Sequence, residues 1–151
     1  MFSLRKYIAN TIVVILALIF FSSGIGKLLE PAGAENALVM SFGISYDVSN
    51  LLVILLSNAE IALALLVLTK RFRVIAMRFI FSVLVFFLVF LLYVKANGII
   101  LDDCGCFGGL IKRTIPEAIV DEIVLIAICS GYFIINRKVA ETQRKLIIEK
   151  I

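Results

Sequence analysis

Long apolar runs alternate with short polar segments along the whole chain. The runs cover Tyr7–Ser23, Leu51–Leu68, Phe79–Val94 and Ile115–Ile135. A transmembrane helix needs about 20 mostly apolar residues. With their flanking turns, the runs predict helices at about 7–23, 51–68, 74–96 and 115–136. We therefore expect an all-α integral membrane protein, a four-transmembrane-helix bundle that forms a single membrane domain over residues 1–151.

Polar and turn-forming residues mark the expected helix ends. They are Ser49 or Asn50 as the cap of the second helix, Asn97-Gly98 at the end of the third, and Thr114 with Glu117 at capping-box spacing before the fourth.

Two features of the first connection bear on the topology. The stretch Glu35–Phe42 is too short to span a bilayer and predicts a short helix at the outer interface, over the mouth of the bundle. Ala32-Gly33-Ala34 resembles a signal-peptide cleavage site, but it lies farther from the apolar run than such sites usually do. We therefore expect the first span to be retained.

Lysine and arginine are unevenly distributed between the connections. Two precede the first run, four surround the second connection and five follow the fourth run, which makes 11 of 15: Arg5, Lys6, Lys70, Arg71, Arg73, Arg78, Arg137, Lys138, Arg144, Lys145 and Lys150. The positive-inside rule then predicts that both termini are cytoplasmic, with outward loops at 24–50 and 97–114 and a basic cytoplasmic tail at 137–151. This asymmetry and contact with the lipid bilayer explain the net charge of +4, so no nucleic-acid partner is expected.

Composition excludes several classes of protein. Hydrophobic residues make up 62% of the chain, charged residues 17%, and the mean hydropathy is +1.12, which excludes a water-soluble globule and a disordered chain. The chain has no histidine, so zinc hydrolases, His-ligated haem and Ser-His triads are excluded, and no haem or metal cofactor is expected.

The second outward loop contains a cysteine pair in the segment Cys104-Gly105-Cys106. This predicted position is on the oxidising side of a bacterial-type inner membrane. A bend at Gly105 would bring the two Cα atoms into the disulfide range of about 4.4 to 6.8 Å, and such a strained bond would be labile. A static disulfide, half of a metal site and two reduced packing residues remain alternatives to redox exchange. Cys129 lies about 20 Å farther along its helix, where a packing role is expected.

Ionisable residues occur within two of the expected spans. Glu60 lies about 15 Å inside the second, where a carboxyl needs a proton or a partner, such as Lys27 at the outward end of the first helix. A hydrogen bond that merely holds helices together is the alternative role. Asp121 lies about 7.5 Å inside the fourth span. If it or Glu122 faces the bundle instead of the interface, it offers a proton donor or acceptor beneath the thiols.

Phe79, Val83, Phe86 and Phe90 share one helical stripe. Such a stripe is typical of lipid contact or helix packing. A flat apolar carrier such as a quinone is the alternative occupant.

Four segments together resemble the methylamine-utilisation protein MauE family, relatives of the DoxX-like membrane proteins, over roughly Thr11 to Ile135. They are Phe21-Ser22-Ser23-Gly24-Ile25-Gly26-Lys27-Leu28-Leu29-Glu30-Pro31, then Ser57-Asn58-Ala59-Glu60, then Asp103-Cys104-Gly105-Cys106-Phe107-Gly108-Gly109, and Asp121.

The resemblance implies a four-helix membrane protein associated with redox maturation of exported proteins, beside a thioredoxin-like extracytoplasmic partner or a client thiol protein. The layout is similar to that of quinone-coupled disulfide-generating proteins, which implies a membrane quinone as cofactor. On that analogy Cys104 and Cys106 are the redox pair, and Lys27, Glu60 and Asp121 are the polar proton site below. Those enzymes commonly carry Cys-x-x-Cys, whereas this chain has a one-residue spacer and no second pair.

Three functional hypotheses follow. The first is a thiol-disulfide oxidoreductase that accepts electrons at Cys104 and Cys106, although its turnover as an enzyme is left open. The second is a non-enzymatic assembly or scaffold subunit whose cysteines staple the loop. The third is a small transporter that uses Glu60 as a proton-coupled site.

Overall fold

The described part of the chain is entirely helical. The computed structural model describes residues 2–99, 104–105 and 113–148, with side chains described only within 4–138. Five helices occur there, namely α1 (Phe2–Leu29), α2 (Ala32–Phe42), α3 (Tyr46–Leu68), α4 (Arg73–Ala96) and α5 (Ile115–Ile148), and these residues form no strand. The predicted all-α class is confirmed for this part of the chain.

Four of the helices are long and apolar enough to cross a membrane. The candidate spans are Leu4–Leu29, Tyr46–Leu68, Arg73–Ala96 and Ile115–Lys138. Even the shortest span, at 23 residues, exceeds the hydrocarbon core of about 30 Å when each residue rises about 1.5 Å. The chain is therefore a multi-pass membrane protein, as its four apolar runs predict.

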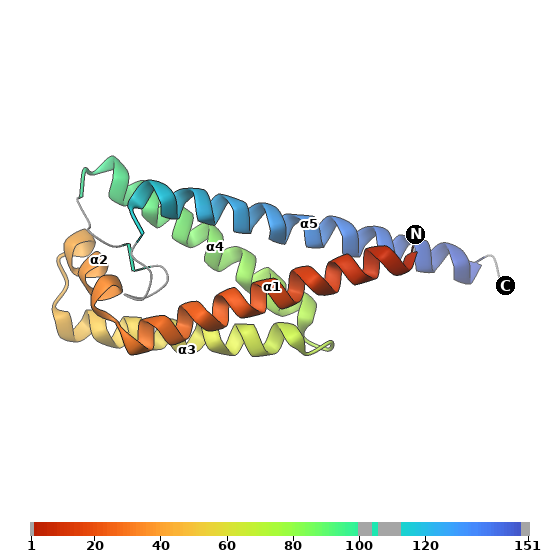
Figure 1. Ribbon diagram of the computed structural model, residues 1–151, viewed down its shortest axis with the longest axis horizontal. Coiled ribbons are helices and arrows are strands. Elements are labelled where there is room, and N and C mark those ends of the chain that lie inside the picture. Colours follow the sequence, from red (N-terminus) through yellow and green to blue (C-terminus); the bar gives the residue numbers. More distant parts are fainter. Residues whose placement is uncertain (1, 100–103, 106–112, 149–151) are drawn as a thin grey trace.

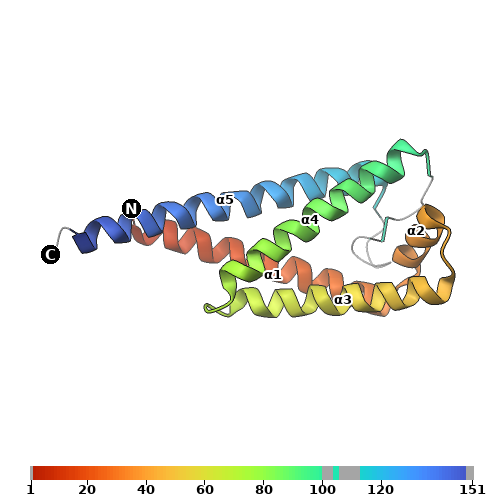
Figure 2. The ribbon, with the colours of Figure 1, turned by 180° about the vertical axis from the view of Figure 1, so that it is seen from behind.

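The four long helices close into a ring. Helix α1 packs against α3 and α5, and α4 packs against the same two helices from the other side. Neighbours in the ring run antiparallel, so both chain ends lie at one end of the bundle and α2 lies at the other (Figure 1; Figure 2). We refer to these as the terminal end and the α2 end.

Three helices, α1, α3 and α5, begin or end several residues outside the predicted ranges. Helix α1 continues past residue 23 to Leu29, because no residue that stops a helix occurs before Pro31. Helix α3 begins at Tyr46 instead of residue 51, so the expected cap at Ser49 or Asn50 is wrong. Both side chains donate to Glu35 of α2 instead: Ser49 Oγ to the carbonyl oxygen at 3.0 Å, and Asn50 Nδ2 to Oε1 at 2.5 Å.

The predicted end of the third span and the predicted start of the fourth are confirmed. Helix α4 ends at Ala96, followed by Asn97 and by Gly98 with a φ of 65°. The Thr114 N–H donates to Glu117 Oε2 at 3.0 Å at the start of α5. Helix α5 then continues through the expected tail as far as Ile148, where the sequence contains neither glycine nor proline.

Polar side chains interrupt the apolar interior. A large apolar cluster from α1, α3, α4 and α5 fills the half of the bundle nearer the terminal end. A small cluster of Leu91, Cys104 and Ala118 lies nearer the α2 end. Apart from Ser49 near the start of α3, the buried polar residues of the helices lie between the two clusters along the length of the bundle. These residues are Ser23, Lys27, Ser57, Glu60 and Glu122.

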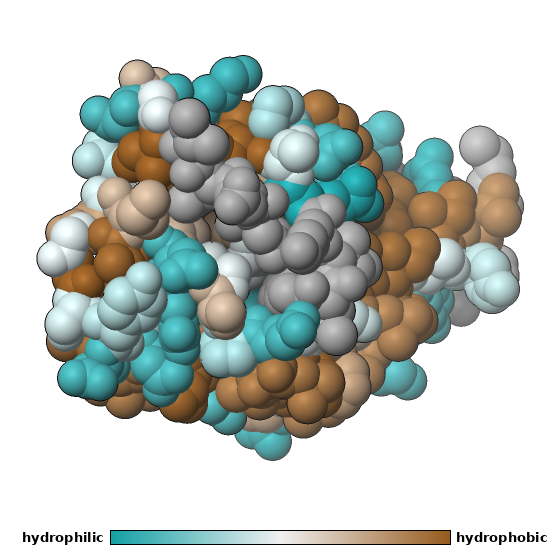
Figure 3. Space-filling model, turned by 60° about the vertical axis from the view of Figure 1, so that its left-hand side comes forward, coloured by the Kyte–Doolittle hydropathy of each residue, from teal (hydrophilic) through white to brown (hydrophobic). Residues whose placement is uncertain are grey.

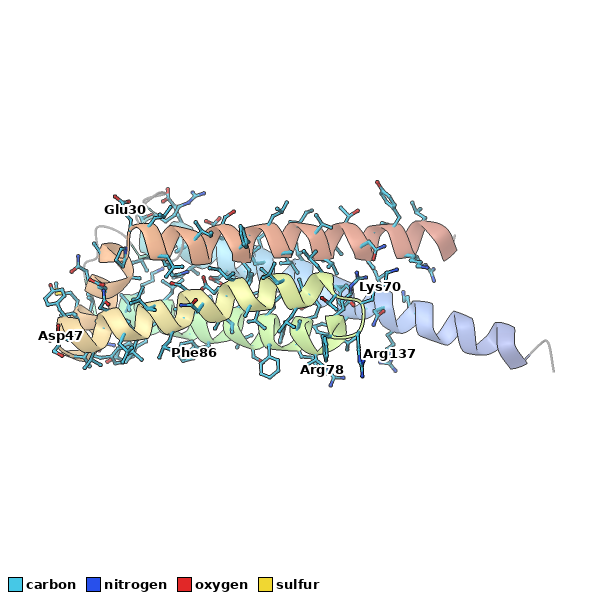
Figure 4. All side chains as sticks on the ribbon, turned by 90° about the horizontal axis from the view of Figure 1, so that it is seen from below. Glu30, Asp47, Lys70, Arg78, Phe86 and Arg137 are labelled. Atoms are coloured by element: carbon cyan, nitrogen blue, oxygen red, sulfur yellow. The ribbon has the colours of Figure 1, made fainter. Side chains whose placement is uncertain are left out.

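The outer surface is apolar along the helices and charged at both ends. Large apolar side chains such as Leu18, Leu55 and Val120 are exposed on the outside of the bundle, whereas hydrophilic residues gather at the α2 end (Figure 3). In Figure 4, Glu30 and Asp47 lie toward the α2 end, and Lys70, Arg78 and Arg137 lie toward the terminal end. This distribution matches a helical bundle whose sides contact lipid, while its orientation in the membrane stays a prediction.

Candidate functional site

Helices α1 and α3 approach closely at Gly24. A Cβ atom on Gly24 would lie 2.8 Å from the Ser57 carbonyl oxygen and 2.7 Å from Ile61 Cγ1, both on α3. Such distances are shorter than real contacts, so only glycine permits this approach. Small residues commonly allow close packing of membrane helices. The consequence is that Lys27, one turn farther along α1, lies directly against Glu60.

Lys27 and Glu60 form a buried ion pair. The Lys27 Nζ atom donates to Glu60 Oε1 and to Oε2, each at 2.9 Å, and to Ser23 Oγ at 2.5 Å. Lys27 is 1% exposed and Glu60 3%, and the ammonium lies 5.6 Å from the centre of the Phe87 ring. The protein thus supplies the hydrogen bonds that water would otherwise provide, which an ionised group inside a membrane requires.

Glu122 of α5 faces the same interior. It is 8% exposed, and its Oε2 atom has no hydrogen-bond partner within the described chain. Ser23, Glu60 and Glu122 line one cavity of about 20 Å³ whose remaining walls are apolar side chains, among them Phe20 and Phe87. The site therefore brings together one lysine and two carboxyl groups.

Asp121 lies on a different side of α5. Its Oδ2 atom is 3.5 Å from Arg113 Nε in an ion pair whose side chains are 34% and 40% exposed. It lines a separate cavity together with Arg113, Ile19, Val124 and Leu125. Of the three polar residues singled out from the sequence, the structure brings Lys27 and Glu60 together, and the third group that faces them is Glu122. The helical spacing of the buried residues Ala118, Glu122, Leu125 and Cys129 is the sequence signal that distinguishes Glu122 from its neighbour.

A backbone hydrogen bond and the close packing of the next residue, Gly105, hold Cys104 in place. Its N–H donates to the Arg113 carbonyl oxygen at 3.2 Å, and its side chain, 4% exposed, packs with Leu91 and Ala118. Gly105 has a φ of 65°, and a Cβ atom there would overlap the backbone of Ala34 at the start of α2. Cys106, the other predicted redox cysteine, lies outside the described residues.

A second cavity, of about 70 Å³, connects Cys104 to the aromatic side chains of α4. It is lined by residues of α1, α2, α3, α4 and the cysteine segment, including Lys27, Phe42, Phe86, Phe87, Phe90 and Cys104. The Phe42 and Phe90 rings stack with their centres 5.8 Å apart. The predicted aromatic stripe is therefore divided: Phe86 and Phe90 line this cavity, Val83 lines the smaller one, and Phe79 is 59% exposed on the outer surface.

The third cysteine packs in the apolar interior. Cys129 is fully buried in the large cluster and its thiol lies 3.8 Å from the Met77 carbonyl oxygen. The predicted packing role is confirmed. Among the side chains described, no three Cys, Asp or Glu residues are arranged to hold a metal ion.

Comparison with known proteins gives one match. The model of the family described as methylamine utilisation protein MauE matches residues 5–135. No curated protein and no solved structure matches the chain significantly.

Proposed function

The chain belongs to the methylamine utilisation protein MauE family, and we propose that it is a membrane thiol-disulfide redox protein acting through Cys104 and Cys106. The partner in this proposal is an extracytoplasmic thioredoxin-like protein or a client protein with a thiol pair. The family name suggests methylamine utilisation as one setting for such maturation. The charge pattern predicts that the α2 end faces outward, which supports a position of the cysteines on the oxidising side.

The observation that carries the proposal is the environment of Cys104. Its buried sulfur borders a cavity that also contains Lys27, and the next residue, Gly105, adopts a left-handed backbone conformation. A turn at the one-residue spacer is what bridging two cysteines at this spacing requires. A bridge of that kind is strained, and strain raises the tendency of a disulfide to accept electrons.

The proposed exchange moves two electrons from the client thiols to the cysteine pair. A client thiolate attacks the Cys104–Cys106 disulfide, which forms a mixed disulfide and releases one cysteine as a thiolate. The second client thiol then resolves the mixed disulfide. The client gains a disulfide, and the chain holds two thiols in place of its own bond.

A membrane quinone is the proposed electron acceptor that restores the disulfide. The cavity beside Cys104 has aromatic walls suited to a flat ring, and Phe86 lies at its lipid-facing edge with 67% of its surface exposed. Its volume of about 70 Å³ is smaller than the ~150 Å³ cavity that accommodates benzene. A ring would therefore need Phe86 to move aside. A quinone bound there would take up the two electrons of the thiol pair and two protons, of which the thiol pair supplies one and the solvent the other.

Mixed-disulfide trapping tests the proposed exchange. Cys104→Ser and Cys106→Ser each leave one reactive cysteine, and we expect one of them to accumulate a covalent adduct with the extracytoplasmic partner that reductant removes. Cys129→Ser is the matched control, because its buried thiol lies in the apolar cluster, and it should behave like the wild type. Full client oxidation by the Cys104→Ser/Cys106→Ser double variant would reject the proposal.

Two competing functions make different predictions. A scaffold with a structural disulfide would retain its partner after both cysteines are replaced. A transporter that uses Glu60 as a proton-coupled site would lose uptake in Glu60→Gln, whereas replacement of the cysteines would have little effect.

A further inference from the structure

The buried polar cluster contains one carboxyl more than its lysine can neutralise. Lys27 contacts both oxygens of Glu60, and Glu122 lines the same cavity as Glu60 with no hydrogen-bond partner for Oε2 among the residues that the structure describes. If all three groups were ionised, the cluster would carry a net charge of −1 in an apolar interior, where an unpaired charge is strongly disfavoured. One proton bound to the cluster makes it neutral.

The cavity between the carboxyl groups has the size and the walls for one water molecule. Its volume is about 20 Å³, and a buried water needs roughly 10 to 15 Å³ and two to four polar partners. Ser23, Glu60 and Glu122 provide those partners from three different helices. A water bound there would connect Glu122 to the ion pair.

Glu122 also lies close to the proposed redox centre. Ala118, which packs against Cys104, precedes Glu122 by one helical turn on the buried face of α5, an axial distance of about 6 Å. Among the described residues, the ionisable groups within electrostatic range of Glu122 are Lys27 from α1, Glu60 from α3, Cys104 and the neighbouring Asp121. Helix α4 contributes only apolar side chains to the cavity.

We propose that Glu122 and a single water form a buried proton-storage site for the thiol chemistry of Cys104, an inference whose redox part rests on the proposed function. When disulfide exchange releases Cys104 as a thiolate, the Glu122 carboxylic acid gives up its proton, so that Cys104 becomes a thiol and Glu122 a carboxylate. When the disulfide is restored, the thiol loses that proton and Glu122 regains it. The negative charge that exchange creates is thus transferred from the buried sulfur to Glu122, which shares its cavity with Glu60 of the ion pair.

Infrared difference spectroscopy of the purified full-length protein in lipid nanodiscs tests this proposal. With the cysteines oxidised, we expect the carbonyl band of a protonated carboxylic acid, which shifts in D₂O and is lost in Glu122→Gln. Asp121→Asn, the matched control on the adjacent residue, should keep the band. On reduction with dithiothreitol the band should decrease in the wild type and stay constant in the Cys104→Ser/Cys106→Ser variant. Labelling of the wild type with ¹³C-glutamate assigns the band to glutamate even if Glu122→Gln fails to fold.

The possible failures are distinguishable. Absence of the band in the wild type, its persistence in a folded Glu122→Gln variant, or a band that does not respond to reduction would each overturn the proton-storage site. If no mixed disulfide can be trapped while the band is present and depends on Glu122, disulfide exchange with a partner is rejected. The conclusion that Glu122 is protonated then still holds.

Discussion

Lys27 and Glu60 are 33 positions apart in the sequence, yet Nζ lies 2.9 Å from each carboxylate oxygen inside the helical bundle. The pair joins the two helices with the most extensive mutual contact, α1 and α3. It also separates the cavity that contains Cys104 from the cavity that contains Glu122. The same two side chains therefore join two helices and, between them, border both cavities.

Removal of one partner of this pair should destabilise the protein. Lys27→Met leaves a buried carboxylate without its counter-ion, and the loss should be about 3 to 5 kcal/mol of unfolding free energy. The double variant Lys27→Met/Glu60→Leu should recover most of it, because two apolar groups need no counter-ion. Unfolding of the detergent-solubilised variants measures both effects. Equal stability of the single and double variants would contradict a coupled pair.

The close approach at Gly24 gives a second stability prediction. Gly24→Ala places a methyl group against Ser57 and Ile61, so the helices must separate at a cost of about 1 to 3 kcal/mol. Gly131→Ala on α5 is the matched control, since a Cβ atom there meets nothing within 4 Å. The same unfolding assay should find the control variant at least as stable as the wild type. If Gly24→Ala leaves the free energy of unfolding unchanged, α1 and α3 do not need this close contact.

Gly105 should be required for disulfide exchange in a way that Gly98 is not. Both residues have a φ of 65°, but only a Cβ atom at Gly105 would overlap the backbone of α2. Each alanine variant adds backbone strain of about 1 to 3 kcal/mol, while Gly105→Ala must also displace the cysteine segment. We expect Gly105→Ala to lose most of the mixed-disulfide yield and Gly98→Ala to retain it. Equal yields would remove the close packing against α2 from the mechanism.

Filling the aromatic cavity should impair quinone-dependent oxidation of the thiol pair. Phe90→Trp enlarges a side chain that lines this cavity. An overpacking cost of about 1 to 3 kcal/mol corresponds to a roughly 5- to 140-fold higher quinone concentration for half-maximal rate. Phe79→Trp, on the exposed outer surface, is the control and should have no effect. Rates of dithiol oxidation with a soluble quinone analogue provide the measurement. If Phe90→Trp needs the same quinone concentration as the wild type for half-maximal rate, this cavity is excluded as the quinone site.

The orientation of the bundle can be tested with single cysteines in a background that lacks the three native ones. Asp47→Cys at the α2 end should react with a membrane-impermeant maleimide added to intact cells, and Lys70→Cys at the opposite end should not. Permeabilised cells should show labelling of both. The reverse pattern would put the cysteine segment on the cytoplasmic side and reject the proposed function.

The sequence by itself determined the number of spanning helices, since the length and hydropathy of a run are local properties that decide whether it can cross a bilayer. It also predicted the ends marked by Asn97-Gly98 and by Thr114 with Glu117, because capping depends on residues a few positions apart. It could not find that α3 starts early to bind Glu35 of α2 through Ser49 and Asn50, because that interaction joins two different helices.

Tertiary structure decided which polar groups meet. Asp121 and Glu122 are adjacent acids whose directions differ by about 100° around the helix, and only the packing of α5 against α1 and α4 turns Glu122 inward and Asp121 toward Arg113. Likewise, Lys27 reaches Glu60 because Gly24 lets two backbones approach. Side-chain direction and backbone separation depend on the packing of the whole bundle. The sequence pattern could therefore identify these residues as candidates, but it could not predict which of them contact one another.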